Sequence, residues 1–359
     1  MRLAAATLVI YSHSYALVGL KEPASHNQTL GSIAVDTFFV ISGLLIAASW
    51  QNHARVAVFL GKRLLRIMPA LIVVILVSVF VIGPVFTSLP LKAYFENNQT
   101  YAYLNGISLF GMTDNLPGVF AANKYTSING SLWTLPCEFV AYLTIAFLGK
   151  TNLLRKNHVA IIGWAGFVAL YFITRHTGNW LVIFNMAVYR LVPLLAFFFA
   201  GVVLYVYRNK IKLMRQLALL SVALLLIPLP WTLMMLTQFI ALPYLIVYIG
   251  SMTWTKFNRL ERYGDFSYGT YVFAWPIQQI IIDLYGGNIG HKRLFVLATL
   301  STLMVAMTSW YLVEKPMLKL KLISTPNATH FCLMLGKIKF LKSARKYAKS
   351  ARPFVSMNI

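Results

Sequence analysis

Residues 3–19 read LAAATLVIYSHSYALVG, a run that is apolar except for a polar patch centred on His13. As an α-helix, which rises about 1.5 Å per residue, a run of this length comes close to crossing a hydrocarbon core of about 30 Å. Serine and tyrosine flank the histidine on both sides. Because ionisable groups are costly in a membrane and usually functional there, the stretch predicts a membrane helix that carries a functional histidine.

The composition extends this prediction to most of the chain. The 359 residues are 58% hydrophobic and only 11% charged, with a mean hydropathy of +0.68, whereas soluble domains carry about 25% charged residues. Apolar runs of membrane-spanning length recur ten times. They lie at 3–19, 31–50, 68–87, 132–149, 158–174, 188–207, 215–232, 234–252, 266–285 and 293–315. The sequence therefore predicts an all-α, polytopic integral membrane protein with about ten transmembrane helices.

The net charge of +23 follows the predicted loops and gives no indication of nucleic-acid binding. With the N-terminus in the cytoplasm, 25 of the 32 Lys and Arg residues fall in inside loops and six in outside loops, and Arg190 remains at the edge of a span. Cytoplasmic loops of membrane proteins carry such an excess. We therefore expect an N-in, C-in topology and no nucleic-acid partner.

We expect two regions, a transmembrane domain over 1–316 and a basic amphipathic cytoplasmic tail over 317–359. The tail contains KIKFLKSARKYAKSARPF, a pattern typical of a helix lying on the anionic inner leaflet. One long outside loop, from about 88 to 130, is rich in Asn, Thr, Tyr and Gly and is suited to meeting a sugar.

Two further features bear on the class of protein. The two cysteines, Cys137 and Cys332, fall on opposite sides of the predicted membrane, so we expect neither a disulfide nor a metal site. The first span follows Met-Arg and also resembles a signal peptide, but its polar patch and the lack of a small-residue cleavage site favour a permanent helix.

Two acidic residues join His13 at one predicted depth. Helical rise places His13 and Glu138 each roughly 9 Å below the outer ends of their helices, and Asp36 roughly 7 to 8 Å below its own. Three titratable groups in one layer are candidates for catalysis. The alternative is that each is a polar clamp that fixes helix packing through hydrogen bonds.

Arg2 precedes His13 by eleven residues, close to three helical turns, which puts the two side chains on one face about 16 Å apart. Arg63 and Arg66 add two guanidiniums one turn apart, a group suited to phosphate oxygens. A cation at the inner surface and a base far above it match a ligand with phosphates at one end and a reactive carbonyl at the other. An acyl-coenzyme A, such as acetyl-CoA, has this shape.

Six motifs in order resemble acyltransferase family 3, the bacterial membrane O-acyltransferases that modify surface polysaccharides. They are Arg2 followed by His13, VDTFFVISGLLI, KRLLRIMPA, GSLWTLPCEF, FSYGTYVFAWPIQ and LVEKP, and together they extend over nearly all of residues 1–316. The residue patterns of GSLWTLPCEF and of the FSYGTY helix are similar to those of lipopolysaccharide O-acetyltransferases. One departure is Ala274, which stands where many relatives carry a histidine.

The resemblance implies transfer of an acetyl or short acyl group from cytoplasmic acyl-CoA to a sugar hydroxyl of a glycan such as O-antigen, in the bacterial inner membrane. The glycan is free or lipid-linked. His13 is implied to be the essential base and Arg2 its partner. The positions that match motifs with less defined roles are Asp36, Arg63, Arg66 and Glu138.

The mechanism remains open at two points. Either Asp36 or Glu138 can orient the imidazole of His13, and the acyl group can pass directly to the hydroxyl or through an acyl-His13 intermediate. Two other functions fit the polar layer. One is a proton-coupled transporter or flippase that uses the three groups as a relay, although the chain shows no internal repeat. The other is an acyltransferase for a small cytoplasmic acceptor.

Overall fold

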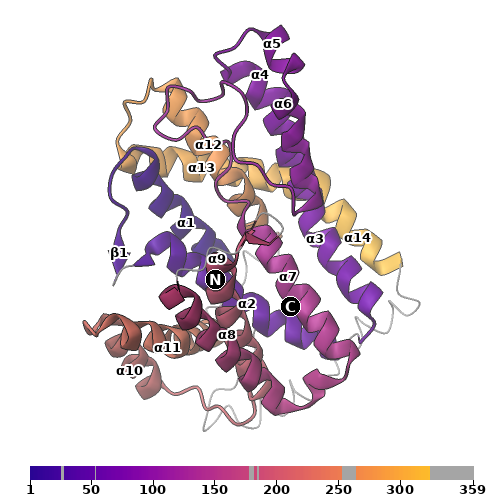
Figure 1. Ribbon diagram of the computed structural model, residues 1–359, viewed down its shortest axis with the longest axis vertical. Helices are drawn as coiled ribbons and strands as arrows, with labels where there is room; N and C mark the ends of the chain where they lie inside the picture. The colour runs from indigo at the N-terminus through magenta and orange to yellow at the C-terminus, as the bar shows by residue number, and fades with distance from the viewer. Residues whose placement is uncertain (26–27, 53, 178–181, 184–185, 253–263, 324–359) are drawn as a thin grey trace.

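The computed structural model describes residues 1–25, 28–52, 54–177, 182–183, 186–252 and 264–323, and nearly all of its regular structure is helical (Figure 1). The longer helices are α1 (Arg2–Leu17), α2 (Leu30–Asn52), α3 (Val56–Val77), α7 (Thr134–Lys150), α8 (Asn157–Thr177), α9 (Val188–Val206), α10 (Arg215–Leu226), α11 (Trp231–Ser251), α12 (Ser267–Leu284) and α13 (His291–Ser309). The shorter ones are η1 (Ser78–Ile82), α4 (Gly83–Phe86), α5 (Leu91–Glu96), α6 (Asn98–Ala102), η2 (Tyr103–Ser108), η3 (Leu153–Arg155), η5 (Trp310–Glu314) and α14 (Lys315–Ile323).

Two small antiparallel hairpins connect helices. Strands β1 (Ala24–Ser25) and β2 (Gln28–Thr29) join α1 to α2, and strands β3 (Val182–Ile183) and β4 (Met186–Ala187) join α8 to α9. The predicted loop from 88 to 130 holds α5, α6 and η2 and is otherwise irregular. Figure 1 shows α4, α5 and α6 together at one end of the molecule, beyond α3.

Each of the ten predicted spans contains a described helix, which confirms an all-α membrane protein. Six helical segments within the described residues are long and apolar enough to cross a membrane. They are Leu30–Asn52, Val56–Phe86, Asn157–Thr177, Val188–Val206, Trp231–Ser251 and His291–Lys319. The remaining four, α1, α7, α10 and α12, are shorter or more polar. Three of these four line the site described below, where polar side chains are needed.

Two predicted helix limits differ from the structure. The run 215–232 does not form one helix, because α10 ends at Leu226, just before the two prolines Pro228 and Pro230. The run predicted to begin at 68 belongs to a helix that starts at Val56 and continues through Pro69. Membrane helices tolerate such an internal proline when neighbours satisfy the backbone.

Small residues bring α2 and α9 into close contact. A Cβ added to Gly43 would overlap the carbonyl oxygen of Phe198, and one added to Gly201 would overlap that of Val40. Glycines at such crossings let two membrane helices approach until their backbones touch. The face of α2 that contains Val40 and Gly43 is therefore the face packed against α9.

We expect Gly43→Ala to lower the unfolding temperature of the detergent-solubilised protein. Overpacking a tight interior typically costs about 1–3 kcal/mol, and here the clash is with a carbonyl oxygen of the backbone. Gly61→Ala on α3 is the matched control, since no described atom beyond its chain neighbours and its own helix backbone lies within 4 Å of a Cβ placed there. Equal unfolding temperatures for the two variants would contradict the close α2–α9 contact.

A second, smaller apolar cluster joins α1, α12 and α13. It contains Ile10, Leu17, Ala274, Ile282, Ile289, Leu294 and Ala298. Ala274 is fully buried in this cluster, so its methyl group packs among apolar side chains. The cluster holds α1 against α12, the two helices that carry the polar residues discussed below.

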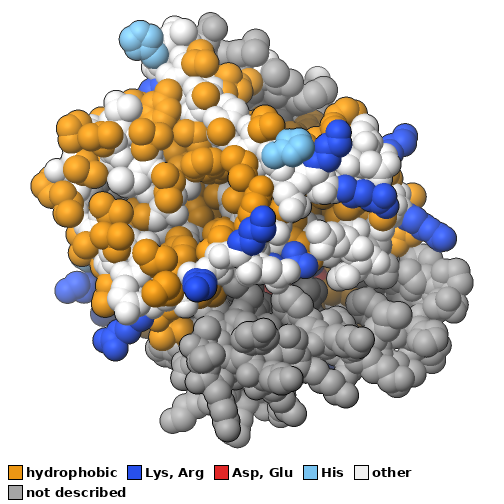
Figure 2. All heavy atoms as spheres, turned by 90° about the horizontal axis from the view of Figure 1, so that it is seen from below, with side chains coloured by type: hydrophobic (Ala, Val, Ile, Leu, Met, Phe, Trp, Pro, Cys, Tyr) orange, Lys and Arg blue, Asp and Glu red, His pale blue; other side chains and the backbone are white. Residues whose placement is uncertain are grey.

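Much of the surface is hydrophobic, as a lipid environment requires. Figure 2 shows a broad hydrophobic area on one face, with Lys and Arg side chains beside it. Many large apolar side chains on the long helices are exposed, among them Phe147, Ile162 and Leu300. The first residues of the predicted basic tail, 317–323, belong to α14, and the rest of it, 324–359, lies outside the described residues.

Candidate active site

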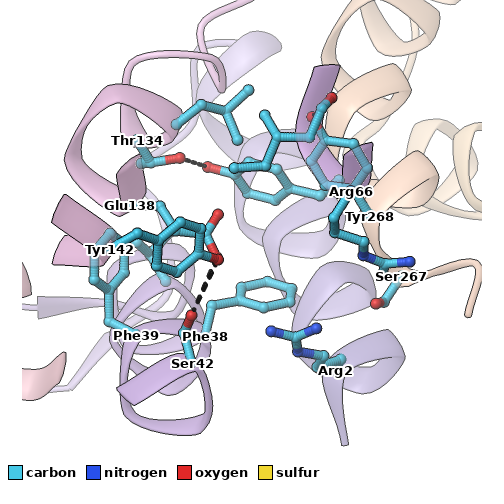
Figure 3. A pocket seen from close by; sticks show the side chains of 14 residues that line it. Arg2, Phe38, Phe39, Ser42, Arg66, Thr134, Glu138, Tyr142, Ser267 and Tyr268 are labelled. Carbon is cyan, nitrogen blue, oxygen red and sulfur yellow. Dashed lines mark hydrogen bonds between the residues drawn. The ribbon is translucent and has the colours of Figure 1, made fainter. Parts of the chain in front are cut away.

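A pocket lies between α1, α2, α3, α7 and α12, and its empty volume, including the space open to solvent at its mouth, is about 630 Å³ (Figure 3). Its lining residues come from all five helices. They are Arg2, Val35, Phe38, Phe39, Ser42, Arg66, Ile67, Thr134, Leu135, Glu138, Tyr142, Ser267, Tyr268 and Tyr271. Three of the six residues predicted for the site, Arg2, Arg66 and Glu138, thus meet in one pocket.

One end of the pocket is cationic and is organised by a carboxylate. Asp265 Oδ2 lies 2.6 Å from Arg66 Nη2 and 3.9 Å from Arg2 Nη1. Its other oxygen, Oδ1, accepts a hydrogen bond from Ser267 N at 3.2 Å and another from the Ser267 hydroxyl, which fixes the start of α12. We call Arg2, Arg66 and Asp265 the charged end of the pocket.

The charged end keeps a net positive charge. Burial raises the pKa of the Asp265 carboxyl, but the guanidiniums of Arg66 and Arg2 and the hydrogen bonds from Ser267 together lower it by more, so the carboxyl is ionised. Two guanidiniums therefore face one carboxylate. Each guanidinium has five N–H donors, and Arg2 Nε has no hydrogen-bond partner among the described residues. The charged end can accept an anionic group such as a phosphate.

The opposite wall is a hydrogen-bonded group on α2 and α7. Ser42 Oγ donates to Glu138 Oε1 at 3.2 Å and lies 3.4 Å from the hydroxyl of Tyr142, which itself donates to Glu138. Glu138 and Tyr142 are four residues apart, so they lie on one face of α7. In Figure 3 this group lies across the pocket from Arg2 and Arg66.

Along α12 the pocket ends at Tyr271. The hydroxyl of Tyr271 lies 2.7 Å from Thr134 Oγ1 and donates to the carbonyl oxygen of Ser131 at 3.0 Å. All three residues are buried. These hydrogen bonds tie the beginning of α7 to α12 and close this end of the pocket with fixed side chains.

His13 lies one helical turn beyond this end. Its ring packs edge-to-face on Trp275, with the ring centroids 4.7 Å apart, and Trp275 follows Tyr271 by four residues on α12. Among the described residues, buried His13 Nδ1 has no hydrogen-bond partner, an arrangement that costs free energy unless a ligand satisfies it. The structure thus places His13 next to the pocket, not in its lining.

Arg2 and His13 both face α12, as their spacing predicts. Arg2 lies near Asp265, and His13, eleven residues later, lies on Trp275, ten residues after Asp265. The two helices therefore run side by side in the same direction, and the charged end and the histidine lie along one path. About 16 Å of helix separates Arg2 from His13.

The turn that carries His13 is braced by polar groups. Gln278 Nε2 donates to the carbonyl oxygen of Ile10 at 3.0 Å and to Ser14 Oγ at 2.9 Å, and Ser14 Oγ donates to the same carbonyl at 2.7 Å. On the other side of the histidine, Ser12 donates to Glu22. The serines of the polar patch thus hold the helix, and no residue that the structure describes is hydrogen-bonded to His13 Nδ1.

Two predicted site residues lie away from the pocket lining. Asp36 is buried on α2, four residues before Val40 and seven before Gly43, and so lies on the face that packs against α9. Its side chain is hydrogen-bonded to Gln28. Arg63 is outside the lining, and its Cζ lies 5.1 Å from the centroid of the Phe59 ring and 6.0 Å from that of the Tyr142 ring.

Among the described residues, neither Asp36 nor Glu138 accepts a hydrogen bond from His13 Nδ1, so the expected orientation of the imidazole by an acid is not seen at this nitrogen. Glu138 is hydrogen-bonded to Ser42 and Tyr142, and Asp36 to Gln28, whereas Nδ1 of His13 has no partner among the described residues. The described residues also contain no group of three His, Cys, Asp or Glu side chains that could hold a metal ion.

Sequence reasoning missed Asp265 and the tyrosines of the lining. Asp265 stands two residues before Ser267 in GDFSYGTY, where a short acidic side chain at a helix start is a capping signal. With only nine acidic residues in the chain, this signal was available. Tyr271 lies within the motif FSYGTYVFAWPIQ but had no role assigned to it. Tyr142 gave no signal, because a tyrosine in an apolar helix is equally compatible with packing.

Comparisons with known proteins show the family to which the chain belongs. The family described as "Acyltransferase domain" matches residues 1–314. An "O-acetyl transferase" of Shigella phage Sf6 is 31% identical over 324 residues, which are 88% of this chain and 93% of the relative. "Nodulation protein 10" of Rhizobium leguminosarum bv. viciae is 26% identical over 354 residues, covering 89% and 92% of the two chains.

A third relative matches a shorter part. "Acyltransferase MdmB" of Streptomyces mycarofaciens is 30% identical over 139 residues, 39% of this chain and 33% of the relative. No solved structure matches the chain. The family match covers the helices that form the pocket, and it favours an enzyme over a transporter. The chain therefore belongs to acyltransferase family 3 and is a membrane enzyme that transfers acyl groups.

Proposed function

We propose that the protein is an O-acetyltransferase that moves an acetyl or another short acyl group from cytoplasmic acyl-CoA to a sugar hydroxyl of a surface polysaccharide such as lipopolysaccharide O-antigen. The observation that carries the proposal is a pocket with a cationic end at Arg2 and Arg66 and an opposite end one helical turn from His13. A donor with phosphates at one end and a thioester at the other fits this layout.

The charged end is the proposed site for the phosphates of the donor. Arg66 and Arg2 would bind them through charge-assisted hydrogen bonds, which are roughly twice as strong as hydrogen bonds between neutral groups. The aromatic lining, with Phe38, Tyr268 and Tyr271, would cover the slim arm of the donor and keep water away from the thioester. In this arrangement Arg63 lies outside the lining and does not contact the donor.

His13 is the proposed general base. It would remove the proton of the acceptor hydroxyl, whose oxygen forms a bond to the thioester carbonyl carbon while the carbon–sulfur bond breaks. The proton then passes from His13 to the departing thiolate. A route through an acyl-His13 intermediate uses the same groups and would leave an acylated protein when the acceptor is absent.

We further propose that the enzyme lies in the bacterial inner membrane with ten spans and both termini in the cytoplasm. The distribution of Lys and Arg supports this orientation. It puts the charged end of the pocket on the cytoplasmic side, where acyl-CoA is made, and the 88–130 loop on the outer side, where a free or lipid-linked glycan arrives. Asp36 would then be a packing residue between α2 and α9.

The test is acetyl transfer by the purified protein. Protein in proteoliposomes would receive acetyl-CoA labelled in the acetyl group together with extracted bacterial surface glycan, and the label on the glycan and the released coenzyme A would be measured. We expect both to rise together and only with acceptor present. Label on a small cytoplasmic acceptor alone, or release of coenzyme A without labelled glycan, would refute the surface-glycan function.

A further inference from the structure

The side chain of Trp275 is held rigidly beside His13. Its Nε1 donates to the carbonyl oxygen of Ser127 at 3.0 Å. A Cβ added to Gly130 would lie 2.7 Å from the indole ring, so the backbone of the 127–131 segment packs directly on it. An indole fixed by a hydrogen bond and by backbone contact cannot move aside without displacing this segment.

The indole lies next to the histidine, one helical turn beyond the pocket lining on α12. Trp275 lies one turn after Tyr271, the last residue of the pocket lining on α12, and its ring meets the His13 ring at an interplanar angle of 77°. The segment that holds Trp275 is anchored to α12 a second time, because Asn129 Nδ2 donates to the carbonyl oxygen of Val272 at 2.8 Å. The space next to the imidazole is thus bounded by a fixed wall.

We propose that Trp275 limits the length of the acyl group that the enzyme transfers. The inference rests on the proposed function, since it requires the thioester carbonyl to lie beside His13. The carbons beyond that carbonyl must fit in the same space, and the indole fills part of it. An acetyl group adds one methyl to the carbonyl, whereas a butyryl group needs room for two further carbons.

The magnitude follows from the behaviour of apolar pockets. One methylene more or less in such a pocket changes kcat/KM by about 10- to 200-fold. Trp275→Ala removes the whole indole, so the ratio of kcat/KM for butyryl-CoA to that for acetyl-CoA is expected to rise by about 10-fold or more. Because both donors carry the same phosphates, the ratio cancels any change in donor binding at the charged end.

The experiment measures transfer from acetyl-, propionyl- and butyryl-CoA to one glycan acceptor by the wild type, Trp275→Ala and Trp275→Phe. The phenylalanine variant removes the Ser127 hydrogen bond and leaves a large ring, so it should keep the preference for acetyl. Trp231→Ala is the matched control. That tryptophan packs on Tyr171 and Phe172, away from the pocket lining, and its loss should not change the ratio.

The outcomes separate the inference from the proposed function. A higher butyryl-to-acetyl ratio in Trp275→Ala alone supports the inference. An unchanged ratio, an equal loss for all three donors, or an equal shift in Trp231→Ala overturns it. If Trp275→Ala does not fold, Trp275→Leu takes its place with the same expectations. Absence of acetyl transfer by the wild type would refute the proposed function itself, before any variant is compared.

Discussion

Replacing His13 with alanine is expected to lower acceptor-dependent acetyl transfer by about 10²- to 10⁴-fold, the typical contribution of a general base. The physical reason is that the hydroxyl then has no group to take its proton as its oxygen attacks the thioester. Donor binding should persist, because His13 lies outside the pocket lining and the charged end is about 16 Å away along α1. Turnover and the dissociation constant for coenzyme A are the two measurements.

The control for His13→Ala is His176→Ala, a histidine exposed in the last turn of α8. It should retain wild-type turnover. The unfolding temperature of both variants in detergent shows whether either protein is damaged. Wild-type turnover in a folded His13→Ala protein would reduce His13 to a packing residue on Trp275. Loss of coenzyme A binding together with turnover would indicate that the change disturbs α1 and not the chemistry.

The second large effect is expected at Arg66. Arg66→Gln should raise the KM for acetyl-CoA by about 10- to 100-fold, since a hydrogen bond to a charged group typically contributes about 1.5–3 kcal/mol. It should also lower the unfolding temperature, because Asp265 loses the partner that lies 2.6 Å away. Initial rates over a range of acetyl-CoA concentrations, with acceptor saturating, give the KM.

The two effects of Arg66→Gln can be separated. The double variant Arg66→Gln with Asp265→Asn removes the carboxylate that has lost its nearest guanidinium and should recover part of the unfolding temperature, while the KM stays high because the Arg66 guanidinium is still missing. Arg155→Gln, an exposed arginine in the short η3 helix, is the surface control and should leave both quantities unchanged. A wild-type KM in Arg66→Gln would show that the charged end does not bind the donor.

The class of fold could be predicted from the sequence because a hydrocarbon environment imposes a simple demand. Runs such as 3–19 and 31–50 are long and apolar, and only a helix satisfies its own backbone groups in lipid. The same reasoning located His13, Glu138 and Arg2 as polar exceptions within or beside such runs. It failed at helix limits near prolines, because a proline can either end a membrane helix or lie within one. Pro228 follows the end of α10, whereas Pro69 lies inside α3.

The tertiary structure decided which polar residues meet. Asp36 and Glu138 are equally unusual in an apolar helix, yet only Glu138 lines the pocket, while Asp36 lies on the face toward α9. The sequence does not distinguish them, because lipid is as apolar as the interior, so the pattern along a membrane helix does not mark the face that meets another helix. Helix contacts and ion pairs both depend on residues that are far apart in the chain, such as Gly43 with Phe198 and Arg66 with Asp265. Only the folded arrangement brings these residues together.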